Sequence, residues 1–278
     1  MSVRVSYVVL SHNSRPHLTR CVSSLLSQGS DDEVLVFENG STDGSADLLQ
    51  SLASRESRVK AFFSATNLGT TASRNIALRE TRGRYLGIVD SDVETPAGTV
   101  DRLIAQLDAD ATCGIAVPRL LYPDGRLQLS TDVFPTLARK FQRYFGLRSL
   151  ERDWAATGGP ALAVPVDYAI SAFWVMRRDL PGRIGYLDDR IFYSPEDVDY
   201  CIRVWQDGLR VIYDPSATAI HHAQEISRKF PLRRATLSHI KGLFYLFRKH
   251  AYGVLHSRPR GVPRPAVMDD ATRLTSCI

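Results

Sequence analysis

Short apolar runs alternate with stretches of helical periodicity from the start of the chain to about Cys113. Brief apolar runs indicate buried strands, and apolar residues spaced three and four apart indicate helices that cover them. The predicted strands cover residues 5–10, 34–37, 59–63 and 84–89, and the predicted helices cover residues 16–28, 45–52, 71–80 and 97–107. Strands and helices that alternate through short loops are typical of a parallel sheet wound with helices, so the pattern predicts an α/β fold.

The strict alternation ends after the last of these helices. The later predicted elements are a strand at 115–117, a hairpin turn at 123–125, a strand at 169–177, a helix at 196–206 and a strand at 210–213. Residues 131–165 have little periodicity, and we expect a long loop there with one basic helical stretch around 137–145.

The segment 226–255 is predicted to be a basic amphipathic helical extension. Its apolar residues Ile240, Leu243, Phe244 and Phe247 recur at helical spacing, and basic residues including Lys241 follow a neighbouring face. Such a helix could lie on an anionic lipid surface, or its apolar stripe could pack on the rest of the protein, and both interpretations stay open. The segment 256–278 is expected to be a flexible tail.

The composition indicates a class of protein and a cellular compartment. The chain has 278 residues, of which 44% are hydrophobic and 23% charged, which is typical of a globular protein. Its cysteines form no Cys-x-x-Cys pair, so neither a disulfide framework nor a zinc site is indicated, and a reducing cytosol fits best. No apolar run reaches the length of a membrane span, and the first run is interrupted by polar residues, which disfavours a signal peptide.

The positive charge is unevenly distributed. The formal net charge is +5, and residues 226–268 contain no acidic residue at all. This concentration predicts an anionic partner for that segment. Basic residues interleaved with aromatic ones are not evident, so nucleic acid is not the expected partner.

Asp90-Ser91-Asp92 follows the predicted strand 84–89 and is the strongest chemical signal in the chain. Carboxylates spaced in this way suit a hard divalent cation. Open parallel sheets bind ligands beyond the carboxyl ends of their strands, where polar residues such as Ser11, Asn39 and Arg74 also fall. Together these loops predict a site for a nucleoside diphosphate.

With these motifs in place, the chain resembles the family 2 glycosyltransferases, which are inverting enzymes of the GT-A fold that use nucleotide-sugar donors. The motifs that carry the resemblance occupy residues 8–13, 36–45, 67–69, 74–75, 90–92, 194–199 and 220–221. The resemblance implies a Rossmann-like, mixed but mostly parallel sheet with flanking helices and a C-terminal helical extension. It implies a catalytic domain over 1–225, with a nucleotide-sugar half at 1–115 and an acceptor half at 116–225.

The resemblance also implies roles for individual residues on the donor side. The residues expected to bind the nucleotide sugar are Ser11, Asn13, Arg15, Asn39, Arg74, Asp90 and Ser91. Asp92 would bind Mg²⁺ or Mn²⁺ directly, whereas Asp90 would approach the ribose or the water shell of the metal. A second metal ligand is expected from His221, with His222 as the alternative.

On the acceptor side, the resemblance makes Asp197 the catalytic base and Glu196 an acceptor-orienting residue. Inversion requires a base opposite the leaving diphosphate, and the two acids stand where a helix is predicted to begin. The chain departs from the family pattern at His12, Glu38 and Ser171, and the last of these puts the shape of the acceptor side in doubt.

The sequence therefore favours a glycosyltransferase that moves a sugar from a UDP- or dTDP-sugar to a glycan, glycolipid or metabolite acceptor, with a rhamnosyltransferase-like subgroup as one option. The expected location is the cytoplasm, with or without peripheral contact at the inner face of the cell membrane. The alternatives are a haloacid dehalogenase-type phosphatase and a non-catalytic nucleotide-sugar or membrane-binding protein. The pattern does not predict the oligomeric state.

Overall fold

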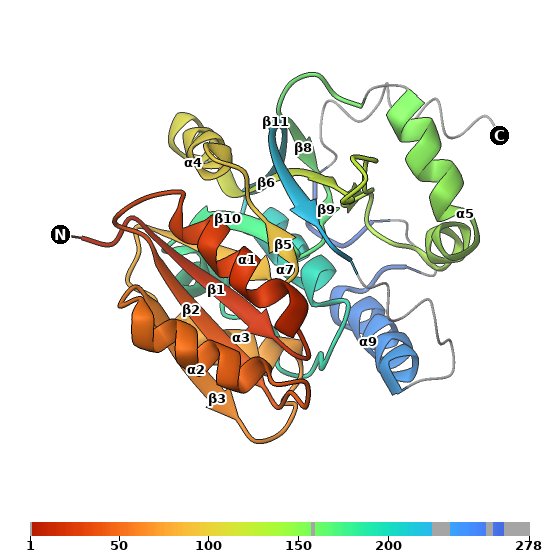
Figure 1. Ribbon diagram of the computed structural model, residues 1–278. Helices are drawn as coiled ribbons and strands as arrows, with labels where there is room; N and C mark the ends of the chain where they lie inside the picture. The colour runs from red at the N-terminus through yellow and green to blue at the C-terminus, as the bar shows by residue number, and fades with distance from the viewer. Residues whose placement is uncertain (1, 157–158, 224–233, 254–257, 264–278) are drawn as a thin grey trace.

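A central mixed sheet organises the protein. The computed structural model describes residues 2–156, 159–223, 234–253 and 258–263. Within them, a nine-stranded sheet has the order β3-β2-β1-β4-β10-β6-β11-β5, with β8 paired to β11, and a second sheet pairs β7 with β9. Helices cover both faces of the main sheet (Figure 1). The predicted α/β fold is confirmed.

The elements follow the predicted alternation in the first part of the chain. The strands are β1 Val5–Ser11, β2 Glu33–Asn39, β3 Val59–Ser64, β4 Tyr85–Asp90, β5 Val93–Glu94, β6 Cys113–Leu121, β7 Thr131–Asp132, β8 Val164–Val166, β9 Tyr168–Ala169, β10 Phe173–Arg177 and β11 Arg210–His221. The helices are α1 Arg15–Leu26, α2 Ser45–Arg55, α3 Thr70–Arg79, α4 Thr99–Ala109, α5 Leu137–Ala156, α6 Leu180–Ile184, α7 Glu196–Gln206 and α9 Arg234–His250.

Strands β1 to β4 form the parallel half of the sheet. Alternate residues point to opposite faces, so Val8 packs on the face covered by α3 and α7, whereas Val9 packs on the face covered by α1, α2 and α4. Ser11 is in register with Glu38, and Leu10 with Asp90. The carboxyl ends of these strands therefore meet at one edge, as the sequence predicts.

Antiparallel strands extend the sheet beyond β4. β10 runs antiparallel to β4, and β11 runs parallel to β6. The predicted strand 210–213 continues instead to His221, because Asp214 accepts hydrogen bonds from the backbone and hydroxyl of Ser216 and the chain resumes pairing after this irregularity. The pairing of β5 with β11 then places His221 opposite Val93, one residue from Asp92.

The segment 131–165 contains more regular structure than a long loop. α5 extends well past the short helical stretch expected around 137–145. Its apolar residues do not form a stripe, so the pattern gives little signal of a helix. Arg139 of α5 pairs with the buried Asp132 at 2.7 Å, which ties the start of the helix to β7.

α9 packs on the main body of the protein, against α7. Leu243, Leu246 and Phe247 are buried in the core cluster that also contains α7. The buried Asp199 of α7 pairs with His250 at 2.8 Å and with Lys249 at 2.6 Å. One of the two open interpretations, apolar packing, is therefore correct for this part of the stripe. The rest of the predicted extension, 226–233 and 254–255, lies outside the described residues, as does most of the tail.

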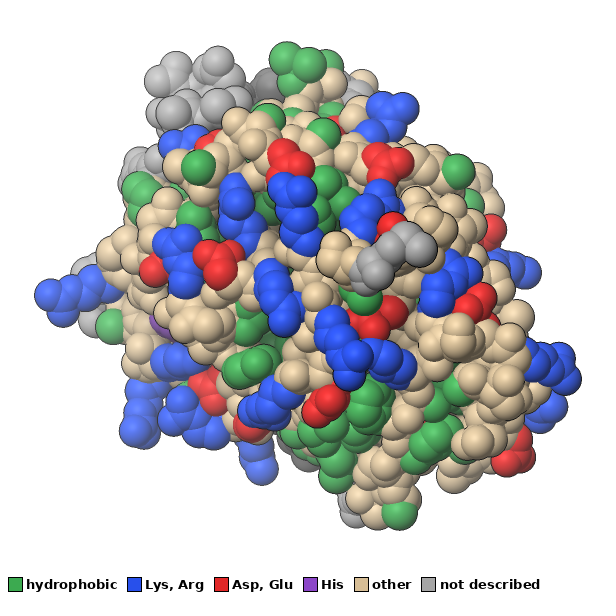
Figure 2. Space-filling model, turned by 90° about the vertical axis from the view of Figure 1, so that its left-hand side faces the viewer, with side chains coloured by type: hydrophobic (Ala, Val, Ile, Leu, Met, Phe, Trp, Pro, Cys, Tyr) green, Lys and Arg blue, Asp and Glu red, His purple; other side chains and the backbone are tan. Residues whose placement is uncertain are grey.

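The face at the amino ends of the parallel strands carries basic side chains interspersed with acidic ones (Figure 2). Arg4, which precedes β1, pairs with Asp32, and Arg84, which precedes β4, pairs with Asp108. Paired charges of this kind do not favour an anionic partner on this face. Among the helices of the described residues, none combines the length and apolarity that crossing a bilayer requires.

Candidate active site

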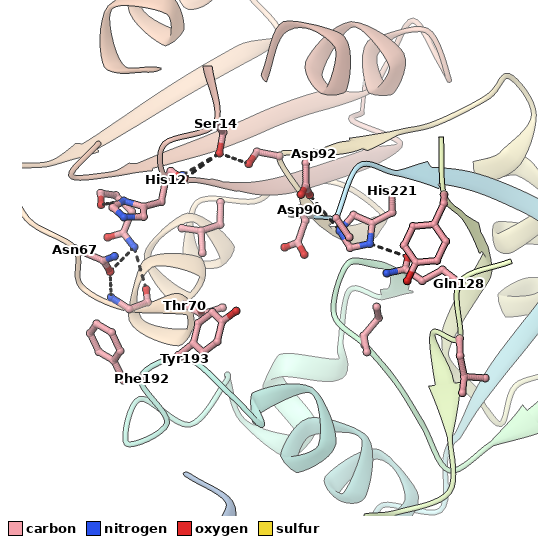
Figure 3. A pocket seen from close by; sticks show the side chains of 18 of the residues that line it. His12, Ser14, Asn67, Thr70, Asp90, Asp92, Gln128, Phe192, Tyr193 and His221 are labelled. Atoms are coloured by element: carbon pink, nitrogen blue, oxygen red, sulfur yellow. Dashed lines mark hydrogen bonds and ion pairs between the residues drawn. The ribbon is translucent and has the colours of Figure 1, made fainter. Parts of the chain in front are cut away.

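The carboxyl ends of the parallel strands open into a cavity of about 490 Å³, a size typical of small-molecule sites. It extends from the loops after β1 and β2, past the end of β4, to the hairpin after β6 and to α5 (Figure 3). Its walls include Leu10, His12, Ser14, Asn39, Asn67, Gly69, Thr70, Asp90, Ser91, Asp92, Tyr122, Gln128, Leu129, Leu147, Glu151, Ile170, Phe192, Tyr193, His221 and Ala223.

Polar side chains at one end of the cavity hold each other in place. Asn39 accepts a hydrogen bond from the backbone N–H of Leu68 and donates to the side chain of Asn67. Nδ1 of His12 lies 2.9 Å from the carbonyl oxygen of Asn39. Because a carbonyl only accepts, Nδ1 carries the proton there, and Nε2 of the neutral ring is an acceptor. This end can therefore present an acceptor to a planar polar ligand.

Asp90, Asp92 and His221 meet at the centre of the cavity. One ligand atom from each lies within 4.8 Å of the others, so the group could hold a metal ion. Nδ1 of His221 lies 2.9 Å from Oε1 of Gln128, while Nε2 lies 3.3 Å from Oδ1 of Asp92. Since Oε1 of Gln128 only accepts, Nδ1 carries the proton, and the lone pair of Nε2 faces the carboxylates.

The electrostatics of this group fit a cation. Burial disfavours the charged form of His221, but the carboxylates of Asp92 and Asp90 raise its pKa above the ordinary value. Burial would also raise the pKa of Asp92, but its contact with His221 lowers it. For Asp90, burial and the charge of Asp92 outweigh the effect of Arg74, so its pKa is raised. Two carboxylates and an imidazole in this arrangement are a ligand set that Mn²⁺ or Mg²⁺ accepts.

The side chain of His222 has different neighbours from that of His221. Its Nε2 lies 3.6 Å from Glu94, and its ring lies 5.1 Å from that of His17. Only its backbone N–H reaches Asp92, whose carbonyl oxygen accepts it at 2.9 Å. The geometry therefore favours His221 over His222 as the ligand.

Arg74 is buried between the acidic motifs and is not part of the cavity wall. Its guanidinium donates to Asp90 at 2.5 Å, to Glu196 at 3.2 Å and to the hydroxyl of Ser171 at 2.7 Å. The same hydroxyl donates to Glu196 at 2.9 Å. This cation thus links the end of β4 to the start of α7.

Glu196 and Asp197 lie in the first turn of α7 and differ in their surroundings. Glu196 is buried, and its burial together with the charge of Asp197 raises its pKa to about 8. Asp197 is less buried, and its Oδ1 accepts the backbone N–H of Val198 at 2.8 Å. Neither carboxyl belongs to the cavity wall, from which they are separated by the residues just before α7.

The remaining predicted nucleotide residues take varied positions. Ser91 lines the cavity and donates to the hydroxyl of Ser14 at 2.6 Å. Ser11 is fully buried and is not a wall residue. Asn13 accepts the backbone N–H of Thr42, and the backbone N–H of Arg15 donates to Asp43. Asn13 and Arg15 therefore join the loop after β1 to the loop after β2, next to the cavity.

Sequence patterns did not identify several wall residues. Gln128 and Glu151 come from a hairpin and a weakly amphipathic helix, far from any motif, so nothing in the sequence singles them out. Glu151 accepts from the hydroxyl of Tyr122 at 3.1 Å. Tyr193 had one available signal, since it directly precedes the motif 194–199 that contains the expected base.

The sequence model of the Glycosyl transferase family 2 matches residues 6–185. Over 261 residues the chain is 27% identical to an N-acetylglucosaminyl-diphospho-decaprenol L-rhamnosyltransferase of Mycobacterium tuberculosis, with 88% of this chain and 84% of the relative covered. Over 105 residues it is 31% identical to an uncharacterized glycosyltransferase, EpsJ, of Bacillus subtilis, with 37% and 30% covered.

Solved structures show the same fold. A crystal structure of GalNAc-T7 with UDP, GalNAc and Mn²⁺ has a TM-score of 0.61 at 16% identity, covering 79% of this chain and 44% of that one. A mannosyltransferase from Pyrobaculum calidifontis in complex with GDP-Man and Mn²⁺ has a TM-score of 0.58 at 18% identity, covering 82% and 59%. The expected GT-A fold is thereby confirmed, and the chain spans only about half the length of these structures.

Proposed function

Because this chain belongs to glycosyl transferase family 2, we propose that it transfers a sugar from a nucleotide diphosphate donor to an acceptor hydroxyl with inversion at the anomeric carbon. The observation that carries the proposal is the meeting of Asp90, Asp92 and His221 in the cavity at the carboxyl ends of the parallel strands. Membership of this family disfavours a haloacid dehalogenase-type phosphatase.

In the proposed mechanism, Asp92 and His221, together with the neighbouring Asp90, would hold a divalent cation beside the donor diphosphate. When bound, Mn²⁺ or Mg²⁺ would neutralise the charge that grows on the departing diphosphate. Asp197 takes the proton of the attacking acceptor hydroxyl. The sugar then passes from donor to acceptor in one displacement, without a covalent intermediate on the protein.

The nucleoside is proposed to lie at the His12 and Asn39 end of the cavity. In the neutral ring of His12, Nε2 is an acceptor, which complements the N3–H donor of uracil or thymine. Among similar structures, one is a complex with UDP and another a complex with GDP-Man, so the similarity does not identify the base. A UDP- or dTDP-sugar is therefore proposed from the chemistry of this end of the cavity.

The acceptor and the transferred sugar are proposed from the similarity to the rhamnosyltransferase of Mycobacterium tuberculosis. The relative in Mycobacterium tuberculosis is named for rhamnosyl transfer to a decaprenol-linked N-acetylglucosamine, and the chain matches it along most of its length. We propose a deoxyhexosyl or hexosyl donor and a lipid-linked glycan acceptor. Residues 1–225 would form the catalytic domain, with the donor in the half before residue 116 and the acceptor in the half after it.

Thermal unfolding of the wild-type chain against nucleotide sugars, with and without Mn²⁺, tests donor binding. A ligand at 100 times its Kd stabilises the native state by about 2.7 kcal/mol. This corresponds to a rise in Tm of roughly 5–10 °C for a chain of this size. Asp92→Ala is expected to lose the Mn²⁺-dependent part of the rise, because the cation loses a carboxylate ligand.

Asp47→Ala, at an exposed position of α2, is the matched control and should keep the full Mn²⁺ response. Absence of stabilisation by any UDP- or dTDP-sugar in the wild type would contradict the proposed donor. An equal Mn²⁺ response in wild type and Asp92→Ala would contradict the role of Asp92.

The outer face of α9 is proposed to touch the cytoplasmic membrane surface. Ile240 and Phe244 are 46% and 62% exposed, and the exposed Lys241 and Arg248 flank them. Apolar side chains bordered by cations suit the interface of an anionic bilayer. This face would bring the catalytic domain to a lipid-linked acceptor, while the opposite face of α9 stays packed on α7.

Flotation with phosphatidylglycerol-containing vesicles tests this contact. Ile240→Asp combined with Phe244→Asp is expected to reduce co-flotation several-fold, because it removes apolar area and adds negative charge. Leu162→Asp, at an exposed leucine elsewhere, should float like the wild type. Equal flotation of the wild type and the double variant would contradict a membrane role for α9.

A further inference from the structure

Tyr193 is a cavity residue that none of the motifs assigns to a task. It lies in the loop between α6 and α7, and its side chain is 39% exposed. In Figure 3 its ring rises into the cavity from this loop, next to Thr70 and Phe192 and across from Asp90. It therefore lies close enough to both the candidate metal group and the first turn of α7 to feel the charges of their carboxylates.

The backbone around Tyr193 is fixed from the donor half of the protein. The hydroxyl of Thr71 donates to the carbonyl of Ile191 at 2.7 Å, and the backbone N–H of Thr70 donates to the carbonyl of Phe192 at 2.6 Å. Earlier in the same loop, Asn75 donates to the carbonyl of Leu187 at 2.8 Å. The start of α3 thus holds the loop at several points.

α9 supports the loop from its other side. A Cβ on Gly242 would lie 2.3 Å from the carbonyl oxygen of Ser194, so the helix backbone closely approaches the residue after Tyr193. A ring held in place from both sides loses little conformational freedom when a ligand binds, which makes it suitable for selective recognition.

The hydroxyl of Tyr193 faces negative charge and has no hydrogen-bond partner among the described residues. Burial, followed by the charges of Glu196, Asp90, Asp197 and Asp92, raises its pKa to about 12. The phenol therefore keeps its proton at neutral pH and is a hydrogen-bond donor. It faces carboxylates from the donor motif and from the base motif alike.

We propose that Tyr193 is a specificity-determining residue that contacts the transferred sugar, donating a hydrogen bond to one of its hydroxyls and covering one face of its ring. This inference rests on the proposed function. In an inverting displacement the anomeric carbon lies between the leaving diphosphate and the attacking hydroxyl, and thus between Asp92 and Asp197. Tyr193 borders that same space.

Tyr193→Phe tests the hydrogen bond while preserving the ring. Binding of UDP and dTDP with Mn²⁺ should match the wild type, because neither contains the transferred sugar. For the nucleotide sugar that the wild type uses, kcat/KM should fall roughly 3- to 10-fold, as expected for loss of one neutral hydrogen bond. Donor analogues that each lack one sugar hydroxyl identify the contact, because for one of them the penalty should disappear.

Phe192→Leu is the matched control. Phe192 also lines the cavity, but its ring lies close to Gly69, at the nucleoside end. This variant should change the affinities for nucleotide and nucleotide sugar by the same factor. An unchanged kcat/KM for the nucleotide sugar in Tyr193→Phe would overturn the inference and leave the proposed function intact. A wild type that uses no nucleotide sugar would overturn both.

Discussion

Asp197→Asn is expected to lower sugar transfer by about 10²- to 10⁴-fold, the range that a positioned general base contributes. The change keeps the shape of the side chain and its contact with the backbone N–H of Val198. It removes only the ability to accept the proton of the attacking hydroxyl. Donor binding should be retained, because the candidate metal ligands are elsewhere, at the end of β4, in the turn before β5 and at the end of β11.

Steady-state transfer and calorimetric binding of the donor, measured on the same preparation, separate these effects. Glu196→Gln is the matched control, since burial and the charge of Asp197 raise the pKa of Glu196 to about 8. At neutral pH the protonated carboxyl and the amide are both uncharged, so the loss in Glu196→Gln should be small and should grow above that pKa. Full turnover by Asp197→Asn would remove Asp197 as the base.

The parallel half of the fold could be predicted because its signals are local. β1, β2 and β4 are buried on both faces, which gives continuous apolar runs, and the helices between them begin near glycine or proline. The positions of Asp90 and Asp92 could also be predicted locally, because both residues lie at the end of a predicted strand. The parallel register of β1, β2 and β4 then places the loops that follow these strands side by side.

The second half was predicted less completely, and the reasons are specific. The prediction ended this strand at Tyr213, just before Asp214-Pro215, but the side chain of Asp214 bonds to Ser216 and pairing resumes. α5 lacks an apolar stripe, and the short β5 is too brief to show alternation. These elements depend on long-range pairing, which periodicity does not report.

Contacts between side chains distant in sequence were the least predictable part of the site. Gln128 and His221 are 93 positions apart, yet their hydrogen bond sets the tautomer of the histidine. Ser171 was a departure from the family pattern, and its hydroxyl lies between Arg74 and Glu196. The serine at this position therefore adds a polar contact between Arg74 and Glu196.

Arg74→Met should destabilise the protein and impair transfer, although Arg74 is not part of the cavity wall. The guanidinium is nearly inaccessible, and its loss would leave the buried Glu196 and the partly exposed Asp90 without their cation. Breaking a buried ion pair costs about 3–5 kcal/mol. We expect about 3 kcal/mol, at the lower end, because Asp90 retains contact with water and the carboxyl of Glu196, with a pKa of about 8, is largely protonated at neutral pH.

The free energy of unfolding of Arg74→Met, measured in urea at two pH values, tests this account. Without the guanidinium, the pKa of each carboxyl rises, so the folded variant binds more protons than the folded wild type. The deficit in stability should therefore be smaller near pH 5 than near pH 8, because protonation relieves the unpaired charges. Ser171→Ala, which removes one partner and no charge, should cost about 1 kcal/mol at both pH values. A deficit for Arg74→Met that is equally small, or that does not grow with pH, would show that Arg74 is not the cation that joins the donor motif to the base helix.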